Sequence, residues 1–245
     1  VIMLTVTILQ FTTLAMKGGA YVYYFENYVS KNSLSDFISP IIDFLSSIGI
    51  NFFGSDPVSA GFGLFNAGGI IFMIIGIGLS KMLADKYGKR NVFGVFLFIS
   101  TLFILVFYVL SPDSINLIFG AQILHGFFYG ITIPLLWAMI ADVADYSEWK
   151  NNRRATAIIF SAMMVGLKLG LSIGGALVAS ILGSYGYVPN SVGEQTESAI
   201  LGTKMLVSIF PSIPFLVAAA LLFFYIIDKK MEEKIEQDLL KKRKS

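Results

Sequence analysis

Apolar residues fill six long runs of this 245-residue chain, and shorter polar stretches separate the runs. A helix that rises 1.5 Å per residue needs about 20 apolar residues to cross the hydrocarbon core of a bilayer. The pattern therefore predicts an all-α integral membrane protein with six spanning helices. These predicted spans are Val1 to Tyr28, Val58 to Leu83, Val92 to Leu110, Ile115 to Ala141, Ala155 to Leu182 and Thr203 to Ile227.

Lysine and arginine are distributed unevenly between the two sides that the six spans define. Loops 84–91 and 142–154 and the tail after Ile227 hold most of them, whereas Lys31 and Lys204 fall on the other side. Short loops that are rich in Lys and Arg remain in the cytoplasm. We therefore expect a multi-pass protein of the plasma or inner membrane, with both ends and the tail in the cytoplasm.

Two amphipathic segments lie outside the six spans. In the loop from Lys31 to Pro57, apolar residues recur at helical spacing opposite polar ones, which predicts a short interfacial helix. In the tail, Met231, Ile235 and Leu239 are spaced four residues apart and precede the basic run Lys241 to Lys244. This pattern predicts a surface helix that is attracted to anionic membrane lipid.

Composition agrees with a membrane protein, since 56% of the residues are hydrophobic and only 14% are charged. The basic residues lie in loops and the tail, so no nucleic-acid partner is expected. The chain has no Cys and no HExxH, GxSxG or paired catalytic carboxylates, which argues against thiol chemistry, a cysteine–metal site and an enzyme. We expect no metal site and no cofactor, and two parts: a six-helix bundle, residues 1–228, and a cytoplasmic basic tail, residues 229–245.

Lys168 lies at the centre of the run Ala155 to Leu182, which contains no acidic residue. A charge at the bilayer centre costs about 2.5–3.5 kcal/mol on insertion scales, so it normally faces a polar cavity and a partner. Gly166, Gly170 and Gly174 form a small-residue face on which another helix packs, and Lys168 points away from that face. We interpret Lys168 as a substrate-binding and cation-coupling residue; the alternative is that it pairs with a carboxylate only for assembly.

The fourth span carries a polar and aromatic stripe that includes Gln122, Tyr129 and Trp137, and Pro134 interrupts its helical hydrogen bonding. Aromatic faces beside polar groups suit sugar rings, whose C–H faces are apolar and whose hydroxyls need hydrogen bonds. We therefore predict that these three residues bind substrate, although each aromatic residue could equally pack inside the bundle. His125, the single histidine, is interpreted as a packing or hydrogen-bonding residue.

The first span carries a second lysine at membrane depth, Lys17, just before a cluster of tyrosines that includes Tyr23. An interfacial aromatic belt explains most of the tyrosines. No carboxylate of this chain lies at a depth comparable to that of Lys17 or Lys168. Either the two lysines neutralise anionic substrates, or helices outside this sequence supply their acidic partners. Lys17 and Tyr23 therefore join the predicted substrate-binding residues.

Acidic and basic residues gather where the fourth span ends. The acidic ones are Asp142, Asp145 and Glu148, and the basic ones that face them across a short turn are Lys150, Arg153 and Arg154. Ion pairs at a closed interface are partly shielded from water and dissolve when water enters. This property suits a cytoplasmic gate, whereas the plainer alternative is a solvated loop whose charges only fix the topology.

Several motifs resemble those of one transporter family. The tract from Pro134 to Lys150 (PLLWAMIADVADYSEWK), followed by Arg154-Ala155-Thr156 and Lys168-Leu169-Gly170, resembles the glycoside-pentoside-hexuronide:cation symporters, to which the melibiose permeases belong. The tract from Leu83 to Arg90 (LADKYGKR) looks like the inner-loop motif of the major facilitator superfamily, with Asp85, Gly88 and Arg90 as its marking residues.

The resemblance covers the second six helices, helices 7 to 12, of a twelve-helix transporter. It implies alternating access between two six-helix halves, with the substrate near the midplane. It also implies that the coupling cation, Na⁺, Li⁺ or H⁺, is bound mainly by the N-terminal half, and that Lys168 lies near the cation and sugar sites. Asp142 and Arg154 match the cytoplasmic charge cluster that bridges the halves. The chain opens inside an apolar run without Met, so we expect a fragment that needs an N-terminal partner half.

Three functions remain open from the sequence. The resemblance favours cation-coupled symport of a sugar, glycoside or uronide. A lipid or lysophospholipid transporter of the same fold is the nearest alternative, and a continuous apolar groove open to the bilayer would favour it. A non-transporting membrane assembly subunit is the third possibility.

Overall fold

The computed structural model describes residues 1–50, 56–189 and 195–244, except for the side chains of residues 243 and 244. Part of the outer loop and the end of the basic run in the tail therefore lie outside the described residues. The described residues form helices and no strand. In chain order the helices are α1 (Ile2–Asn27), α2 (Lys31–Ser47), α3 (Pro57–Tyr87), α4 (Lys89–Val106), α5 (Ile115–Asn151), α6 (Thr156–Ser184), α7 (Glu197–Val207), α8 (Ile209–Phe223) and α9 (Lys229–Lys244).

Six stretches of the described residues are long and apolar enough to cross a membrane, which confirms the predicted number of spans. The fourth span is longer than predicted, because α5 continues past Ala141 until Asn152 adopts a left-handed backbone with φ 54°. The sixth span consists of two helices, α7 and α8, which meet at Ser208. Pro211 has no N–H to donate to the carbonyl of Val207, so the helical hydrogen bonding is interrupted there.

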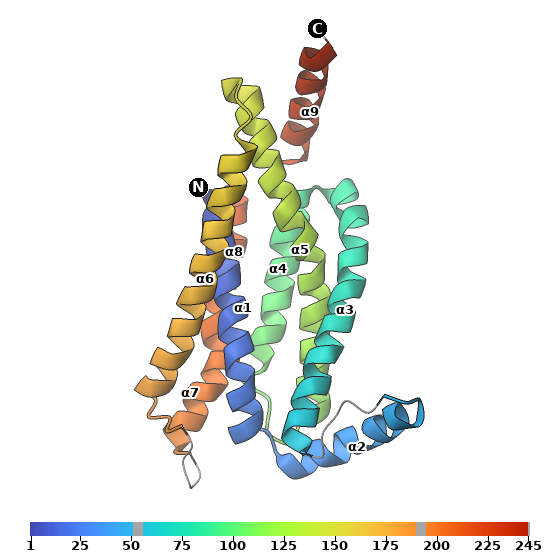
Figure 1. The fold of residues 1–245 in the computed structure, drawn as a ribbon, viewed down its shortest axis with the longest axis vertical. Helices are drawn as coiled ribbons and strands as arrows, with labels where there is room; N and C mark the ends of the chain where they lie inside the picture. Colours follow the sequence, from blue (N-terminus) through green and yellow to red (C-terminus); the bar gives the residue numbers. More distant parts are fainter. Residues whose placement is uncertain (51–55, 190–194, 245) are drawn as a thin grey trace.

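The spans form two layers. α6, α1, α5 and α3 lie side by side in a front layer, and α4 and α8 lie behind it (Figure 1). α1 packs most closely on α6, and α3 on α5, because glycines bring the backbones together. A Cβ added to Gly170 of α6 would meet the carbonyl oxygen of Ile8, and a Cβ added to Gly130 of α5 would meet that of Met73. The predicted glycine face of α6 is thus confirmed as a packing face.

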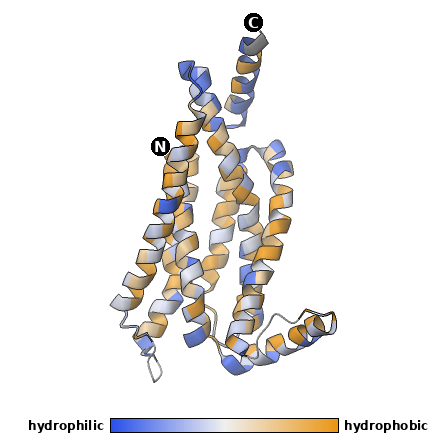
Figure 2. Cartoon of the chain, in the orientation of Figure 1, coloured by the Kyte–Doolittle hydropathy of each residue, from blue (hydrophilic) through white to orange (hydrophobic). Residues whose placement is uncertain are grey.

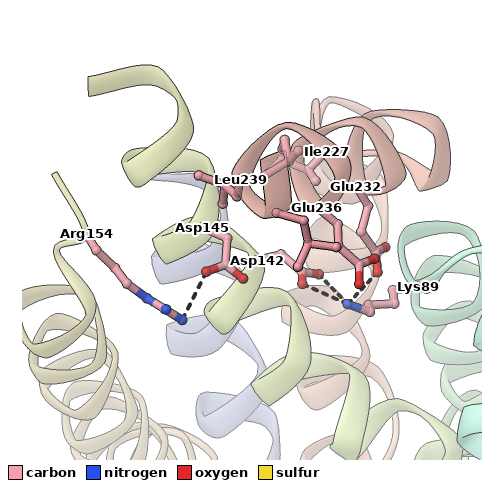
Figure 3. Close-up of a pocket in the computed structure, with 10 residues that line it drawn as sticks. Lys89, Asp142, Asp145, Arg154, Ile227, Glu232, Glu236 and Leu239 are labelled. Carbon is pink, nitrogen blue, oxygen red and sulfur yellow. Dashed lines mark hydrogen bonds and ion pairs between the residues drawn. The ribbon is translucent and has the colours of Figure 1, made fainter. Parts of the chain in front are cut away.

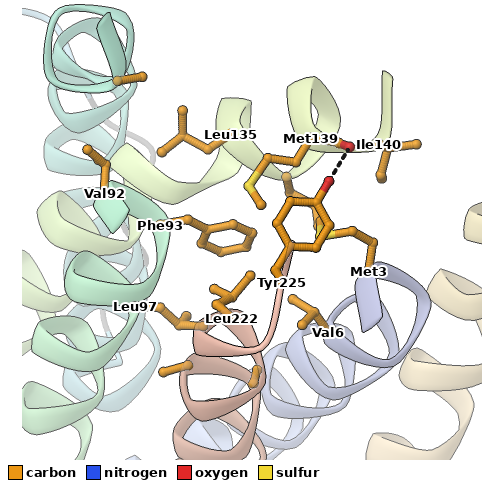
Figure 4. Packing of buried hydrophobic residues seen from close by; sticks show 14 of the residues in the cluster. Met3, Val6, Val92, Phe93, Leu97, Leu135, Met139, Ile140, Leu222 and Tyr225 are labelled. Carbon is orange, nitrogen blue, oxygen red and sulfur yellow. Dashed lines mark hydrogen bonds between the residues drawn. The ribbon is translucent and has the colours of Figure 1, made fainter. Parts of the chain in front are cut away.

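Two clusters of buried apolar side chains hold the bundle together, one toward each end. In the cluster at the α9 end, Phe93 of α4 and Leu135 of α5 pack near Leu222 of α8 (Figure 4). Tyr225, in the segment after α8, belongs to the same cluster. Its hydroxyl donates a hydrogen bond to the carbonyl oxygen of Met139 at 3.4 Å. Between helices in lipid the driving force is close packing rather than exclusion of water.

Polar residues gather at the two ends of the molecule, around α9 and the α5–α6 turn and around α2, whereas the spans are mainly hydrophobic (Figure 2). α2 is the predicted amphipathic helix of the outer loop, and it packs on the bundle through Leu34 and Ile38. Ser33 donates to Asp113 of the α4–α5 loop at 2.8 Å. Hydrogen bonds from Ser30 and Ser33 hold the pKa of Asp113 below its ordinary value.

The tail forms helix α9, as predicted, but its apolar residues pack on protein. Ile235 and Leu239 are buried in the cluster at the α9 end, against which Trp149 of α5 also packs. The Trp149 indole donates to Asp238 of α9 at 3.0 Å. α9 therefore extends beyond the end of α5, along the long axis of the molecule, instead of lying across the ends of the spans (Figure 1).

Candidate functional site

Three helices meet at a charged cluster at the α9 end, which consists of Lys89 of α4, Asp142 of α5 and Glu232 of α9 (Figure 3). The Lys89 ammonium donates to the two carboxylate oxygens of Asp142 at 2.7 and 2.8 Å, and it lies 2.8 Å from Glu232 Oε1. An ammonium has three N–H donors, so these contacts saturate it. The cluster is largely shielded, since the side chains of Lys89 and Asp142 are 23% and 15% exposed.

A second set of ion pairs lies beside the first and links the two sides of the α5–α6 turn. Arg154 lies 3.0 Å from Asp145 and 3.8 Å from Glu148. Its side chain is 49% exposed, so these pairs are more open to water than that of Lys89. Arg153 is exposed and makes no ion pair with the described residues, although its carbonyl oxygen accepts a hydrogen bond from Ser147.

The pairing of Asp142 differs from the prediction. The sequence placed Asp142 opposite Lys150, Arg153 and Arg154, whereas the structure pairs it with Lys89. The reason is the length of α5, which stays helical to Asn151 and carries the turn about two helical turns beyond Asp142. Arg154 therefore reaches back only to the last turns of α5. Lys150 donates to the Tyr146 hydroxyl at 3.3 Å instead.

A cavity of about 360 Å³ lies between the two sets of ion pairs and α9. Its polar lining comes from α4, from the α5–α6 region and from α9, and it consists of Lys89, Asp142, Asp145, Arg154, Glu232 and Glu236 (Figure 3). Leu239 of α9 is one of the apolar residues that line the same space. α9 therefore contributes residues to the lining of this charged cavity.

The inner-loop motif forms the tight connection between α3 and α4. Gly88 adopts φ +85°, which glycine tolerates, and a Cβ there would press on Lys229 of α9 at 3.1 Å. The carbonyl oxygen of Asp85 accepts a hydrogen bond from the Lys229 ammonium at 2.6 Å. Arg90 donates to the carbonyl oxygen of Tyr225 at 2.9 Å. The three motif residues thus hold the end of α8 and the start of α9 against the α3–α4 connection.

A buried polar band crosses the middle of the bundle, between α1 and α5. Gln10 donates to the Tyr129 hydroxyl at 3.1 Å, and Tyr21 donates to Gln122 at 3.0 Å. Lys17 is 5% exposed, and its ammonium lies 5.4 Å from the centre of the Tyr21 ring. Within the described residues Lys17 makes no ion pair. The structure therefore brings together three of the predicted substrate residues, namely Lys17, Gln122 and Tyr129.

His125 lies in the same band. Its Nδ1 lies 3.0 Å from the carbonyl oxygen of Ser100, and its ring stacks on those of Tyr129 and Phe215. The histidine therefore has the packing and hydrogen-bonding contacts that the sequence predicts for it. No group of acidic, histidine or cysteine side chains in the described part of the chain has the arrangement of a metal site.

The other predicted substrate residues lie elsewhere. Lys168 is exposed on the face of α6 that points away from α1, and it makes no ion pair with the described residues. Trp137 is partly buried against the cluster at the α9 end. Tyr23 is partly buried near the opposite end, where its ring meets that of Tyr187 edge to face at 5.1 Å. Within this chain the six residues do not form one site.

Lys89 and Glu232 are the members of the charged cluster that the sequence reasoning missed. Lys89 belongs to the quoted inner-loop tract, and it begins the span that precedes the span of Asp142. Consecutive spans run in opposite directions, so the start of α4 and the end of α5 share one side of the membrane. That signal could have found Lys89. Nothing in the sequence places Glu232 beside it, because the position of α9 is a tertiary feature.

The sequence matches a family described as MFS/sugar transport protein over residues 43–229. The chain belongs to this family. Its resemblance to glycoside:cation symporters of the major facilitator superfamily is thereby confirmed, as is the fold class of a six-helix half of such a transporter. The family and its named members are transporters and not enzymes, and the six apolar helices make the chain a multi-pass membrane protein.

Curated relatives agree with the family. An uncharacterized 29.9 kDa protein of Pseudescherichia vulneris is 35% identical over 158 residues, which are 64% of this chain and 57% of the relative. An uncharacterized symporter of Bacillus subtilis, YjmB, is 32% identical over 171 residues, 69% of this chain and 36% of the relative. A glucuronide carrier protein homolog of Escherichia coli is 30% identical over 176 residues, 70% of this chain and 38% of the relative. The aligned parts span between about a third and somewhat more than half of these relatives.

Proposed function

We propose that this chain is the C-terminal half of a secondary active symporter, which couples downhill entry of Na⁺, Li⁺ or H⁺ to uptake of a sugar, glycoside or uronide. Relatives are named for glycoside-type cargo, among them a glucuronide carrier homolog and an isoprimeverose transporter. The observation that carries the proposal is the open face of α6. Lys168 is exposed there at mid-span and has no partner among the described residues.

A lysine in that position needs an anionic group, because a charge at membrane depth is stable only beside a partner or in a polar cavity. In an alternating-access transporter the substrate lies near the midplane between two halves. An N-terminal half docked on the front layer would bring its carboxylates, the coupling cation and the substrate to Lys168. The expected partner is therefore a second six-helix bundle rather than a soluble protein.

The charged cluster suits a gate at the cytoplasmic end in this proposal. The positive-inside rule assigns the α9 end to the cytoplasm, and the exposed Arg153 remains available to an acidic group of the other half. Charge reversal by Asp142→Lys would place two cations together and separate α4 from α5. We expect cysteine reagents added on the cytoplasmic side to label the inner mouth faster in that variant. Equal labelling of the variant and the wild type would assign these charges to topology alone.

Transport assays test the proposal directly. The chain is reconstituted in vesicles with and without an N-terminal half from a family member, and uptake of labelled glycosides and glucuronides is followed under a Na⁺ or proton gradient. We expect gradient-driven accumulation only when both halves are present. Accumulation by residues 1–245 alone would contradict the half-transporter proposal. No accumulation of any sugar by the complete transporter would favour the assembly-subunit alternative.

A further inference from the structure

An apolar groove with a volume of about 440 Å³ runs between α4 and α8, the two helices behind the front layer. Its rim is formed by large side chains that are exposed on the surface of the bundle, with Val95 53%, Phe98 47% and Phe223 81% exposed. Both helices belong to candidate membrane spans. The groove therefore opens toward the hydrocarbon of the bilayer and not toward the front layer.

Small residues leave the space that forms the groove. Gly94 of α4 and Ala219 and Ala220 of α8 line the groove where larger residues would fill it. A Cβ added to Gly94 would lie 3.8 Å from the Cβ of Leu222, which is an ordinary contact distance. Close packing of the two helices therefore does not require glycine at this position. A larger side chain at residue 94 would occupy the groove without displacing the backbone.

Arg90 stands at the end of the groove nearest α9, beside Asn91. Its Nη1 donates to the carbonyl oxygen of Tyr225 at 2.9 Å, and its Nε lies 3.5 Å from the Asn91 side-chain oxygen. A guanidinium carries five N–H donors, so three remain. Arg90 has no ion pair with a carboxylate of the described residues. An unpaired cation thus lies at one end of a groove whose other lining residues, apart from Asn91, are apolar.

We propose that this groove binds an anionic glycerophospholipid from the leaflet at the α9 end, with an acyl chain between α4 and α8 and the phosphate on Arg90. The guanidinium fork matches the geometry of phosphate, and basic residues near the membrane surface attract anionic lipid. From Arg90 to Phe98 the groove runs about 12 Å along α4, a length that suits part of an extended acyl chain. An entirely apolar helix of another protein would fill the groove but leave Arg90 without an anion.

The position of the groove separates this site from the transport pathway. A pathway for amphipathic cargo would lie between the two halves, on the side of the front layer. The described residues that line the groove all belong to α4 and α8, so a lipid bound there is a stationary partner of the protein. The inference does not depend on the proposed sugar transport.

Lipid retention measured by native mass spectrometry tests the site. The intact chain is purified in mixed micelles that contain equal amounts of phosphatidylglycerol and phosphatidylcholine, and the lipid that remains bound is identified. We expect one retained phosphatidylglycerol. Arg90→Gln should lower the preference for phosphatidylglycerol about five-fold, and Gly94→Leu should remove bound lipid of both kinds. Lys230→Gln removes one exposed cation near the same end but outside the groove, and it should leave retention unchanged.

Thermal unfolding in detergent accompanies each variant, since Arg90 also holds the segment after α8. Arg90→Lys keeps the charge but not the fork, and it should retain part of the preference for phosphatidylglycerol even if stability falls. Retention of phosphatidylglycerol by Gly94→Leu at the wild-type level would overturn the proposal. Equal losses in Arg90→Gln and Lys230→Gln would also overturn it, because they would mean general electrostatic attraction. A wild-type chain that retains both lipids equally would contradict the assignment of Arg90.

Discussion

The two faces of α6 differ in burial and in charge. On one face Gly166, Gly170 and Gly174 are buried against α1, and a Cβ added to any of them would lie 2.5–2.6 Å from an atom of that helix. On the other face Lys168 is exposed, and a Cβ added to Gly175 would meet nothing within 4 Å. The first face is complete within this chain, whereas the second offers a charge and open space to something else.

The same contrast separates two lysines. Lys89 is saturated by Asp142 and Glu232, and its ion pairs join three helices. Lys168 has no ion pair with any described residue. Partnered charges at the α9 end join helices of this bundle, whereas we propose that the unpartnered charge at mid-span takes part in an interaction that the bundle alone does not provide. A substitution of Lys168 should therefore affect transport, whereas substitutions of buried or ion-paired residues should affect the stability of the bundle.

The largest expected effect is on transport, from Lys168→Ala. In the complete transporter it should abolish cation-driven accumulation, because the carboxylates of the other half lose the cation that balances them. Lys168→Arg should retain part of the accumulation. Uptake of labelled glycoside into vesicles measures the effect, and Lys31→Ala, which removes an exposed lysine near the other end, serves as the control. If the Lys168→Ala variant accumulates glycoside to the wild-type level, the exposed face of α6 has no role in transport.

Gly170→Ala should destabilise the packing of α6 on α1. The added Cβ would meet the carbonyl oxygen of Ile8 at 2.5 Å and the Cβ of Phe11 at 2.9 Å, so α1 and α6 must separate. Overpacking of this kind costs about 1–3 kcal/mol. The matched change Gly175→Ala should be neutral or should stabilise by up to about 1 kcal/mol, since alanine favours helix. Thermal unfolding of both variants in detergent compares the two faces directly.

Asp142→Asn should lower the free energy of unfolding by about 1.5–3 kcal/mol, because Lys89 loses a charged acceptor in a largely shielded site. The same substitution at Asp145 should cost less than about 1 kcal/mol, since the side chains of that pair are 49% and 36% exposed. Equal losses in the two variants would mean that burial does not distinguish the two sets of ion pairs.

The smallest effect is expected for Glu232→Gln, at about 0.5–1 kcal/mol, because Asp142 still neutralises Lys89. Its main consequence should be a looser α9. Hydrogen exchange of the α9 amides measures this, and Glu233→Gln is the control, since Glu233 is exposed and does not line the cavity. Unchanged exchange in Glu232→Gln would show that the other contacts of α9, among them those of Ile235 and Leu239, hold it in place without this ion pair.

The sequence by itself determined the six spans, the helical tail and the packing face of α6. Each depends on a local periodicity: a run of apolar residues long enough for the bilayer, or glycines spaced one turn apart. Gly88 was singled out only by the resemblance of its tract to a family motif, and the structure supplies the physical reason for a glycine there, a positive φ in a tight connection between two spans. The ends of the spans were less readable, since α5 continues into polar sequence and the sixth span bends at Ser208.

Only the tertiary structure decided which charges meet. Asp142 and Arg154 share a short stretch of sequence, yet the continued helix carries them apart and each finds another partner. Glu232 reaches Lys89 because Ile235 and Leu239 dock α9 on the bundle, and no local pattern encodes that position. The α4–α8 groove likewise depends on small residues from two distant helices. Local patterns fix helices and their faces, whereas ion pairs and grooves depend on distances between segments that the chain brings together only by folding.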